Sequence, residues 1–95
     1  MYKYFVKITW NENKRLENLK KHQLDFADAE KVFCGPYRLF EDIRFEYEEQ
    51  RWIALGLLHV MVVVIVHTET ETELRIISMR KATRHEQELY FDEYP

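Results

Sequence analysis

The sequence predicts a single α+β domain in which helices pack on an antiparallel sheet of about four to five strands. Its 95 residues match the size of one domain, and the 46% of apolar residues suffice for one core. Helix signals occur twice near the N-terminus and once near the C-terminus, whereas strand signals occupy the first residues and the middle of the chain. This order favours a layer of helices packed on one twisted antiparallel sheet.

The first two elements are a strand over residues 2–10 and a helix over residues 12–22. Residues 2–10 mix aromatic, β-branched and lysine side chains, a composition that is typical of strands. Asn11 is a good N-cap, and Leu16 and Leu19 have the helical spacing of an inward stripe. That stripe is narrow, so we expect a surface helix with a cationic outer side.

Two further helices are predicted, one over residues 26–34 and one from residue 84 to about residue 92. Asp25 can cap the first of them, and Gly35 followed by Pro36 ends it. The run Thr83-Arg84-His85-Glu86 fits a capping box at the start of the last helix. The side chains expected to face inward are Phe26, Ala29, Val32, Phe33 and Leu89.

The remaining strands form an antiparallel meander. They are predicted over residues 37–41, 45–57, 59–68 and 73–79. The continuous Val and Ile run within 59–68 indicates burial on both faces, and therefore a central position in the sheet. Residues 68–72 predict a hairpin turn, although they lack the Gly or Asn that such turns favour.

Charge is unevenly distributed along the chain. The net charge of −3 argues against a broad, nonspecific nucleic-acid platform, which is normally basic. However, residues 3–22 carry six Lys or Arg against two acids, and residues 75–85 carry four Lys or Arg and no acid. Residues 41–50 carry five acids against one Arg. Local positive potential is therefore compatible with the acidic average.

The single cysteine and the apolar pattern limit the class of protein. Cys34 cannot form an internal disulfide, and we expect it to be a buried structural thiol. The longest apolar run, residues 60–66, is far shorter than the roughly 20 residues of a membrane helix. With no signal sequence at its N-terminus, the chain is expected to be cytoplasmic.

Common catalytic motifs are absent, which leaves a set of cationic and acid–base side chains. The chain has only two glycines, so it has no Gly-rich phosphate loop, and its four histidines lack zinc spacing. Lys14 and Lys21 are two helical turns apart and share one face with His22 near its end. This face is either solvated or forms a phosphate track that ends in a titratable imidazole.

The predicted strands carry further candidates. Glu49 and Arg51 are two residues apart, so in a regular strand they would project from the same side as base and phosphate clamp, or as an ordinary ion pair. His67, Arg75 and Arg80 flank the predicted hairpin. Such groups suit metal-free RNA cleavage, which needs a base for the 2′-hydroxyl, cations for the phosphorane and an acid for the leaving oxygen.

Trp10 completes the set of candidates, because an exposed indole can stack on a base. A role in the core is at least as compatible with its position.

Several of these residues together resemble the BrnT-type toxins. The N-terminal part of the resemblance is Ile8-Thr9-Trp10-Asn11 with Lys14, Asn18, Lys21, His22, Phe26 and Ala29. The middle is Glu49-Gln50-Arg51-Trp52 with Gly56, and the C-terminal part is Val66-His67-Thr68, the run from Arg75 to Thr83, and Glu86. One departure is Gln23, where the family usually has glycine.

The resemblance implies one toxin domain over residues 1–95 with a RelE-like fold, acting as a ribonuclease of a type II toxin–antitoxin module. It implies a BrnA-like antitoxin in a 2:2 complex that contacts operator DNA only through the antitoxin. It implies no metal and no cofactor. The active-site positions it implies are Lys21, Glu49, Arg51, Arg75 and Arg80, with Trp10, Lys14, His22 and His67 as weaker substrate-binding candidates.

A second hypothesis is that the chain is a member of the same family that has lost its catalytic activity. In it the chain is a degenerate toxin, a non-catalytic interaction subunit that acts only as co-repressor in an antitoxin–DNA complex. Incubation of the purified protein with RNA distinguishes the two hypotheses.

Overall fold

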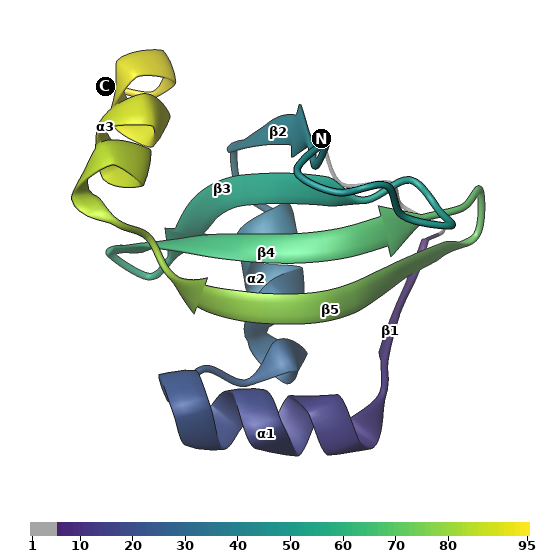
Figure 1. The fold of residues 1–95 in the computed structure, drawn as a ribbon. Coiled ribbons are helices and arrows are strands. Elements are labelled where there is room, and N and C mark those ends of the chain that lie inside the picture. Colours follow the sequence, from purple (N-terminus) through teal and green to yellow (C-terminus); the bar gives the residue numbers. More distant parts are fainter. Residues whose placement is uncertain (1–5) are drawn as a thin grey trace.

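The computed structural model describes residues 6–95, which form a five-stranded sheet with helices on both of its faces (Figure 1). The strand order is β1-β5-β4-β3-β2, so the Val- and Ile-rich strand is central, as predicted. The strands are β1 (Lys7–Trp10), β2 (Tyr37–Glu41), β3 (Trp52–Leu58), β4 (Met61–Glu69) and β5 (Glu73–Lys81). Residues 2–5 of the predicted first strand lie outside the described part of the chain.

The sheet is mixed, and the prediction of a purely antiparallel sheet is wrong. β1 pairs in parallel with β5, whereas the other three pairings are antiparallel. Parallel neighbours need a long connection between them. Here residues 11–72 lie between the two strands, so local sequence patterns could not reveal this pairing.

The helices are α1 (Glu12–His22), α2 (Ala29–Phe33) and α3 (Arg84–Glu93). Asn11 caps α1 by accepting a hydrogen bond from Lys14 N, and the capping box of Thr83 and Glu86 is present at α3. The helix predicted over 26–34 is instead a 3₁₀ turn, Phe26–Asp28, followed by α2. The Asp25 side chain accepts from Ala27 N, and Asp28 N donates to Asp25 O, which tightens this turn.

Two cores lie on opposite faces of the sheet, so the prediction of helices on one face only is wrong. The core on the α2 side contains four of the five predicted inward side chains, Phe26, Ala29, Val32 and Phe33, whereas Leu89 packs against the core on the α3 side. The core on the α3 side is centred on Tyr90, which is 1% exposed and donates a hydrogen bond to Pro36 O. The face opposite α2 is called the open face below, because α3 covers only one end of it (Figure 1).

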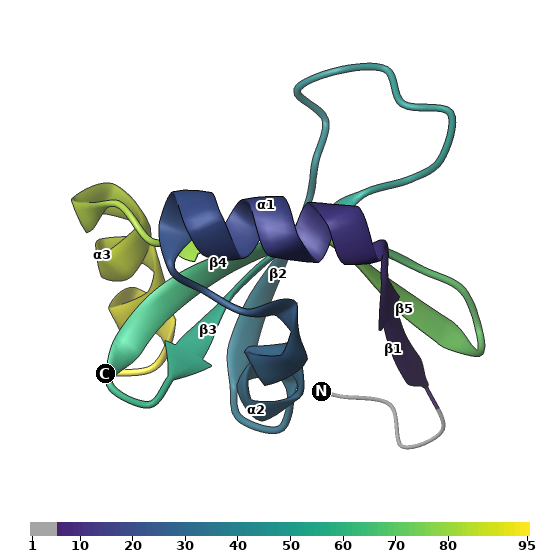
Figure 2. The same cartoon turned by 90° about the horizontal axis from the view of Figure 1, so that it is seen from below.

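The predicted strand over 45–57 begins only at Trp52, and the preceding residues form an arched 42–51 loop (Figure 2). The loop is organised around Asp42, an acidic residue that is only 4% exposed. Its carboxylate accepts from the Arg44 Nε and Nη2 groups at 2.8 and 2.9 Å, and from the Tyr47 hydroxyl at 3.0 Å. These bonds lower the pKa of Asp42 far below its usual range, chiefly through Arg44.

A β-bulge in β5 determines which side chains reach the open face. Val66 pairs with Ser78 and His67 pairs with Ile76, so Ile77 is an extra residue without a partner on β4. Strict alternation would place Arg75 and Arg80 on opposite faces, because Arg80 is five positions, an odd number, after Arg75. With the bulge they pair with Thr68 and Val64, two β4 residues of the same face.

One asparagine attaches α1 to the outer edge of β5. β1 pairs only with Glu73 to Ile76, and beyond it the Asn18 side chain accepts from Met79 N and donates to Met79 O at 3.2 and 2.8 Å. Asn18 also donates to Leu24 O. In contrast, Leu16 and Leu19, the predicted inward stripe, are 50% and 37% exposed. A buried amide, rather than an apolar stripe, therefore sets the position of α1.

We expect Asn18→Ala to destabilise the protein by about 2–4 kcal/mol, because it leaves three buried backbone groups without their partners. Urea unfolding measures this change. Asn13→Ala, on the exposed side of the same helix, is the matched control and should change the free energy of unfolding by less than about 0.5 kcal/mol. Equal stability of the two variants would contradict the role of Asn18.

Gln23 ends α1 in the left-handed region, with φ 58° and ψ 28°. A side chain with a Cβ pays roughly 1–2 kcal/mol in that region, whereas glycine does not. We expect Gln23→Gly to raise the free energy of unfolding by about 0.5–1 kcal/mol, since it also loses the hydrogen bond from Gln23 Nε2 to Lys20 O. Thermal melting checks this, with Gln23→Ala as a control that should be no more stable than the parent.

Candidate functional site

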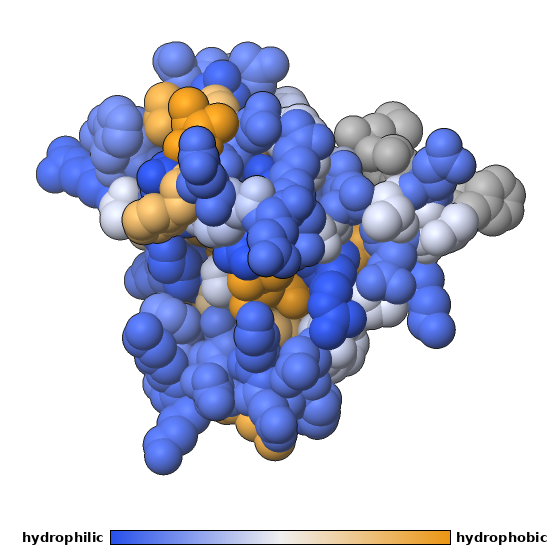
Figure 3. Space-filling model, turned by 45° about the vertical axis from the view of Figure 1, so that its right-hand side comes forward, coloured by the Kyte–Doolittle hydropathy of each residue, from blue (hydrophilic) through white to orange (hydrophobic). Residues whose placement is uncertain are grey.

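A hollow of about 260 Å³ lies where α1 crosses β5, and it is called the β5 recess below. Figure 3 shows an apolar patch in a hollow between hydrophilic surfaces. The recess combines lysines, a histidine, a carboxylate and a hydroxyl with one apolar side chain. It is lined by Lys14, Glu17, Asn18, Lys21, His22, Ile77 and Ser78.

The cations of α1 that face the recess have no acidic partner. Lys14 and Lys21 are exposed and share one face, as predicted, and neither forms an ion pair within residues 6–95. His22 is half-buried beside them. Glu17 lies on the same face, because it is three residues after Lys14 and four residues before Lys21. The sequence therefore contained the signal for Glu17, although it was not among the predicted candidates.

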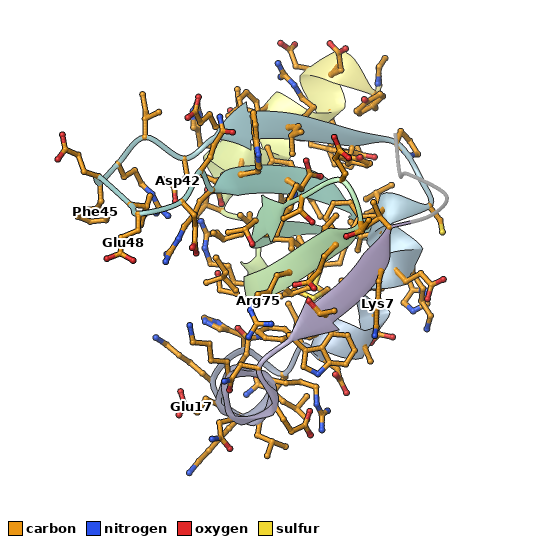
Figure 4. The ribbon with its side chains drawn as sticks, turned by 90° about the vertical axis from the view of Figure 1, so that its right-hand side faces the viewer. Lys7, Glu17, Asp42, Phe45, Glu48 and Arg75 are labelled. Atoms are coloured by element: carbon orange, nitrogen blue, oxygen red, sulfur yellow. The ribbon has the colours of Figure 1, made fainter. Side chains whose placement is uncertain are left out.

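Arg75 projects from the open face between α1, which carries Glu17, and the 42–51 loop, which carries Phe45 and Glu48 (Figure 4). It is exposed, and within the described residues it forms neither a hydrogen bond nor an ion pair. An exposed guanidinium with all five donors free is suited to bind an oxyanion.

Arg80 lies on the same face but is already held by a carboxylate. Its Nη1 and Nη2 groups donate to Oε1 and Oε2 of Glu86, each at 2.8 Å. The bond from Arg80 lowers the pKa of Glu86 to about 2, and the same pair raises the pKa of Arg80. The positive charge of Arg44 opposes this rise in the pKa of Arg80.

Glu49 and Arg51 do not project from a strand, so the expected geometry on one side of the sheet is wrong. Both line a hollow inside the 42–51 loop, and they form no ion pair there. Arg51 stacks on Tyr47, with its Cζ 4.1 Å from the ring centroid. Its Nε is buried without a hydrogen-bond partner in the described part of the chain. Glu49 is exposed.

His67 is 0% exposed, so its placement does not support contact with a substrate. It lies on the α2 side of the sheet, edge-on to Phe33 with 5.2 Å between the ring centroids. Its Nε2 is 3.4 Å from Glu69 Oε1, an ion-pair distance without good hydrogen-bond geometry. Burial lowers the pKa of His67, and the negative charge of Glu69 opposes this only in part.

Trp10 and Cys34 also lie away from the open face. Trp10 packs against the core on the α2 side and donates from Nε1 to Glu12 Oε1 at 3.2 Å, so it is not placed to stack on a base in the recess. Cys34 follows the end of α2 and is exposed, so the expectation of a buried thiol is wrong. Gly35 and Pro36 end the helix so early that the thiol does not reach the core.

Within residues 6–95, no helix is long and apolar enough to cross a membrane. The described residues also contain no group of three His, Cys, Asp or Glu side chains arranged to hold a metal ion.

These features define a small α+β protein with unpaired cations around a shallow recess at one edge of an open sheet face. The family model of BrnT, the ribonuclease toxin of type II toxin–antitoxin systems, matches residues 10–86. The chain therefore belongs to the BrnT family of ribonuclease toxins, and the resemblance inferred from the sequence is confirmed. A comparison with curated proteins gives no match.

We expect the free energy of unfolding to fall as the pH decreases from 7 to 5. The folded state keeps His67 neutral with a lowered pKa, so the unfolded state, with a pKa near 6.5, binds the proton more readily. Urea unfolding at pH 5, 6 and 7 measures this slope. His67→Leu should flatten it, whereas His85→Gln, at an exposed position on α3, should retain it. A wild-type protein equally stable at pH 5 and 7 would show that His67 is not the cause.

Proposed function

We propose that this chain is an endoribonuclease that cleaves RNA without a metal ion and thereby inhibits translation. The observation that carries the proposal is a set of three exposed cations that form no ion pair within residues 6–95: Lys14 and Lys21 line the β5 recess, and Arg75 projects from the open face beside α1. A bent RNA phosphate carries negative charge that such groups compensate, and this charge increases as the phosphorane forms. Membership of a ribonuclease family supports the same reaction.

The positions of the side chains support the following roles. Arg75 and Lys21 bind the phosphate and stabilise the phosphorane, and Arg80 adds a third cation from the same face. His22 is the better candidate for the group that accepts the 2′-hydroxyl proton, because it lines the recess whereas Glu49 lies in the 42–51 loop. Attack of the 2′-oxygen on phosphorus expels the 5′-oxygen, which takes a proton from a general acid.

The remaining parts of the proposal rest on the family. We propose that residues 1–95 act as one RelE-like toxin domain in the cytoplasm, where messenger RNA is found. A BrnA-like antitoxin neutralises it in a 2:2 complex, and operator DNA is contacted through the antitoxin alone. A toxin–antitoxin family implies an antitoxin partner in general, and the type of antitoxin and the stoichiometry belong to the proposal.

We expect Arg75→Ala and Lys21→Ala each to lower the rate of RNA cleavage by about 10²–10³-fold, because each removes a cation that stabilises the transition state. The measurement uses purified protein and single-stranded RNA, in EDTA and without antitoxin. Their melting temperatures should stay unchanged, since neither side chain forms a hydrogen bond or an ion pair with any other residue from 6 to 95.

Lys31→Ala is the matched control for this experiment. Lys31 is an exposed lysine of α2, on the opposite side of the sheet, and within residues 6–95 it forms one exposed ion pair, with Asp28. It should cleave RNA at the wild-type rate. Intact RNA after incubation with the wild-type protein would favour the non-catalytic co-repressor instead.

A further inference from the structure

Arg80 presents a guanidinium of which one edge is occupied and one edge is free. Its Nη1 donates to Glu86 Oε1 at 2.8 Å and to Lys81 O at 3.3 Å, and its Nη2 donates once, to Glu86 Oε2 at 2.8 Å. Three of the five N–H groups are therefore used. The Nε–H and the second Nη2–H have no partner in the part of the chain that the structure describes, and in a planar guanidinium these two point in the same direction.

Such a pair of parallel donors matches two oxygens of a phosphate. The free edge is not enclosed by the fold, because the Arg80 side chain is 36% exposed and Nε is not among the buried polar atoms without partners. The bulge at Ile77 places this arginine on the same face as Arg75. An RNA backbone that lies along β5 would therefore contact the guanidinium groups of both Arg75 and Arg80.

We propose that Glu86 is a positioning residue for RNA cleavage, which fixes the plane of the Arg80 guanidinium so that its free Nε–Nη2 edge binds a phosphate of the substrate. This inference rests on the proposed ribonuclease function. The Glu86 carboxylate is itself fixed, because its Oε1 accepts a hydrogen bond from the main-chain Thr83 N at 2.8 Å. The main chain at the start of α3 thus orients the carboxylate that orients the arginine.

Glu86→Gln tests the proposal while retaining the helix cap. The amide oxygen still accepts from Thr83 N and Arg80 Nη1, but the amide nitrogen cannot accept from Arg80 Nη2. A single remaining bond no longer fixes the plane of the guanidinium. We expect the single-turnover cleavage rate at saturating RNA to fall about 10–100-fold. The Kd for a 2′-O-methyl RNA, which binds without being cleaved, should change by less than about threefold, because the lost contact is mainly one of the transition state.

Thr83→Ala is the matched control, because it removes the Thr83 hydroxyl from the capping box but leaves the Arg80–Glu86 pair. It should lower the melting temperature at least as much as Glu86→Gln, and it should cleave RNA at close to the wild-type rate. Equal losses of cleavage in the two variants would mean that the pair only holds α3 in place, and would overturn the proposal.

A double variant separates positioning from an independent effect. If Glu86 acts through Arg80, then Arg80→Ala combined with Glu86→Gln should be as slow as Arg80→Ala alone. Losses that multiply would overturn the proposal. Cleavage by Glu86→Gln at the wild-type rate would also overturn it and leave the proposed function intact, whereas a wild-type protein that cleaves no RNA would remove the proposed function itself.

Discussion

The extra residue that Ile77 adds to β5 determines how this protein presents its arginines. Because the bulge lies between Arg75 and Arg80, both side chains reach the open face, and Ile76 and Met79 both remain in the core on the α2 side. A regular strand would have buried one guanidinium among apolar side chains, at a high cost in free energy. The proposed RNA surface and the integrity of the larger core therefore depend on the same local irregularity.

The second constraint is the attachment of α1 by Asn18. A buried carboxamide that pairs with Met79 acts like one residue of an additional strand, at the point where β1 no longer covers the edge of β5. Because these hydrogen bonds are directional, they fix both the position of α1 along the edge of β5 and the rotation of α1 about its own axis. As a result, Lys14 and Lys21 lie beside the recess even though the apolar side chains of α1 are largely exposed.

Much of this fold could be predicted from local signals, and the errors have physical reasons. The cap at Asn11, the capping box at Thr83 and the central strand are local features, and the structure contains all three. The parallel pairing of β1, the bulge and the loop around Asp42 depend on contacts between distant residues or on one buried carboxylate. For the same reason Arg75 and Arg80 could be predicted as candidates from the sequence, but their position on one face of the sheet could not.

The position of Cys34 has a practical consequence. It is the single thiol of the chain, it is exposed, and it follows α2 on the side of the sheet away from the β5 recess. A maleimide dye should therefore attach at one defined point without touching the proposed RNA surface. The native protein thus offers a fluorescence probe for its own complexes, and reducing agent is needed during storage to prevent covalent dimers.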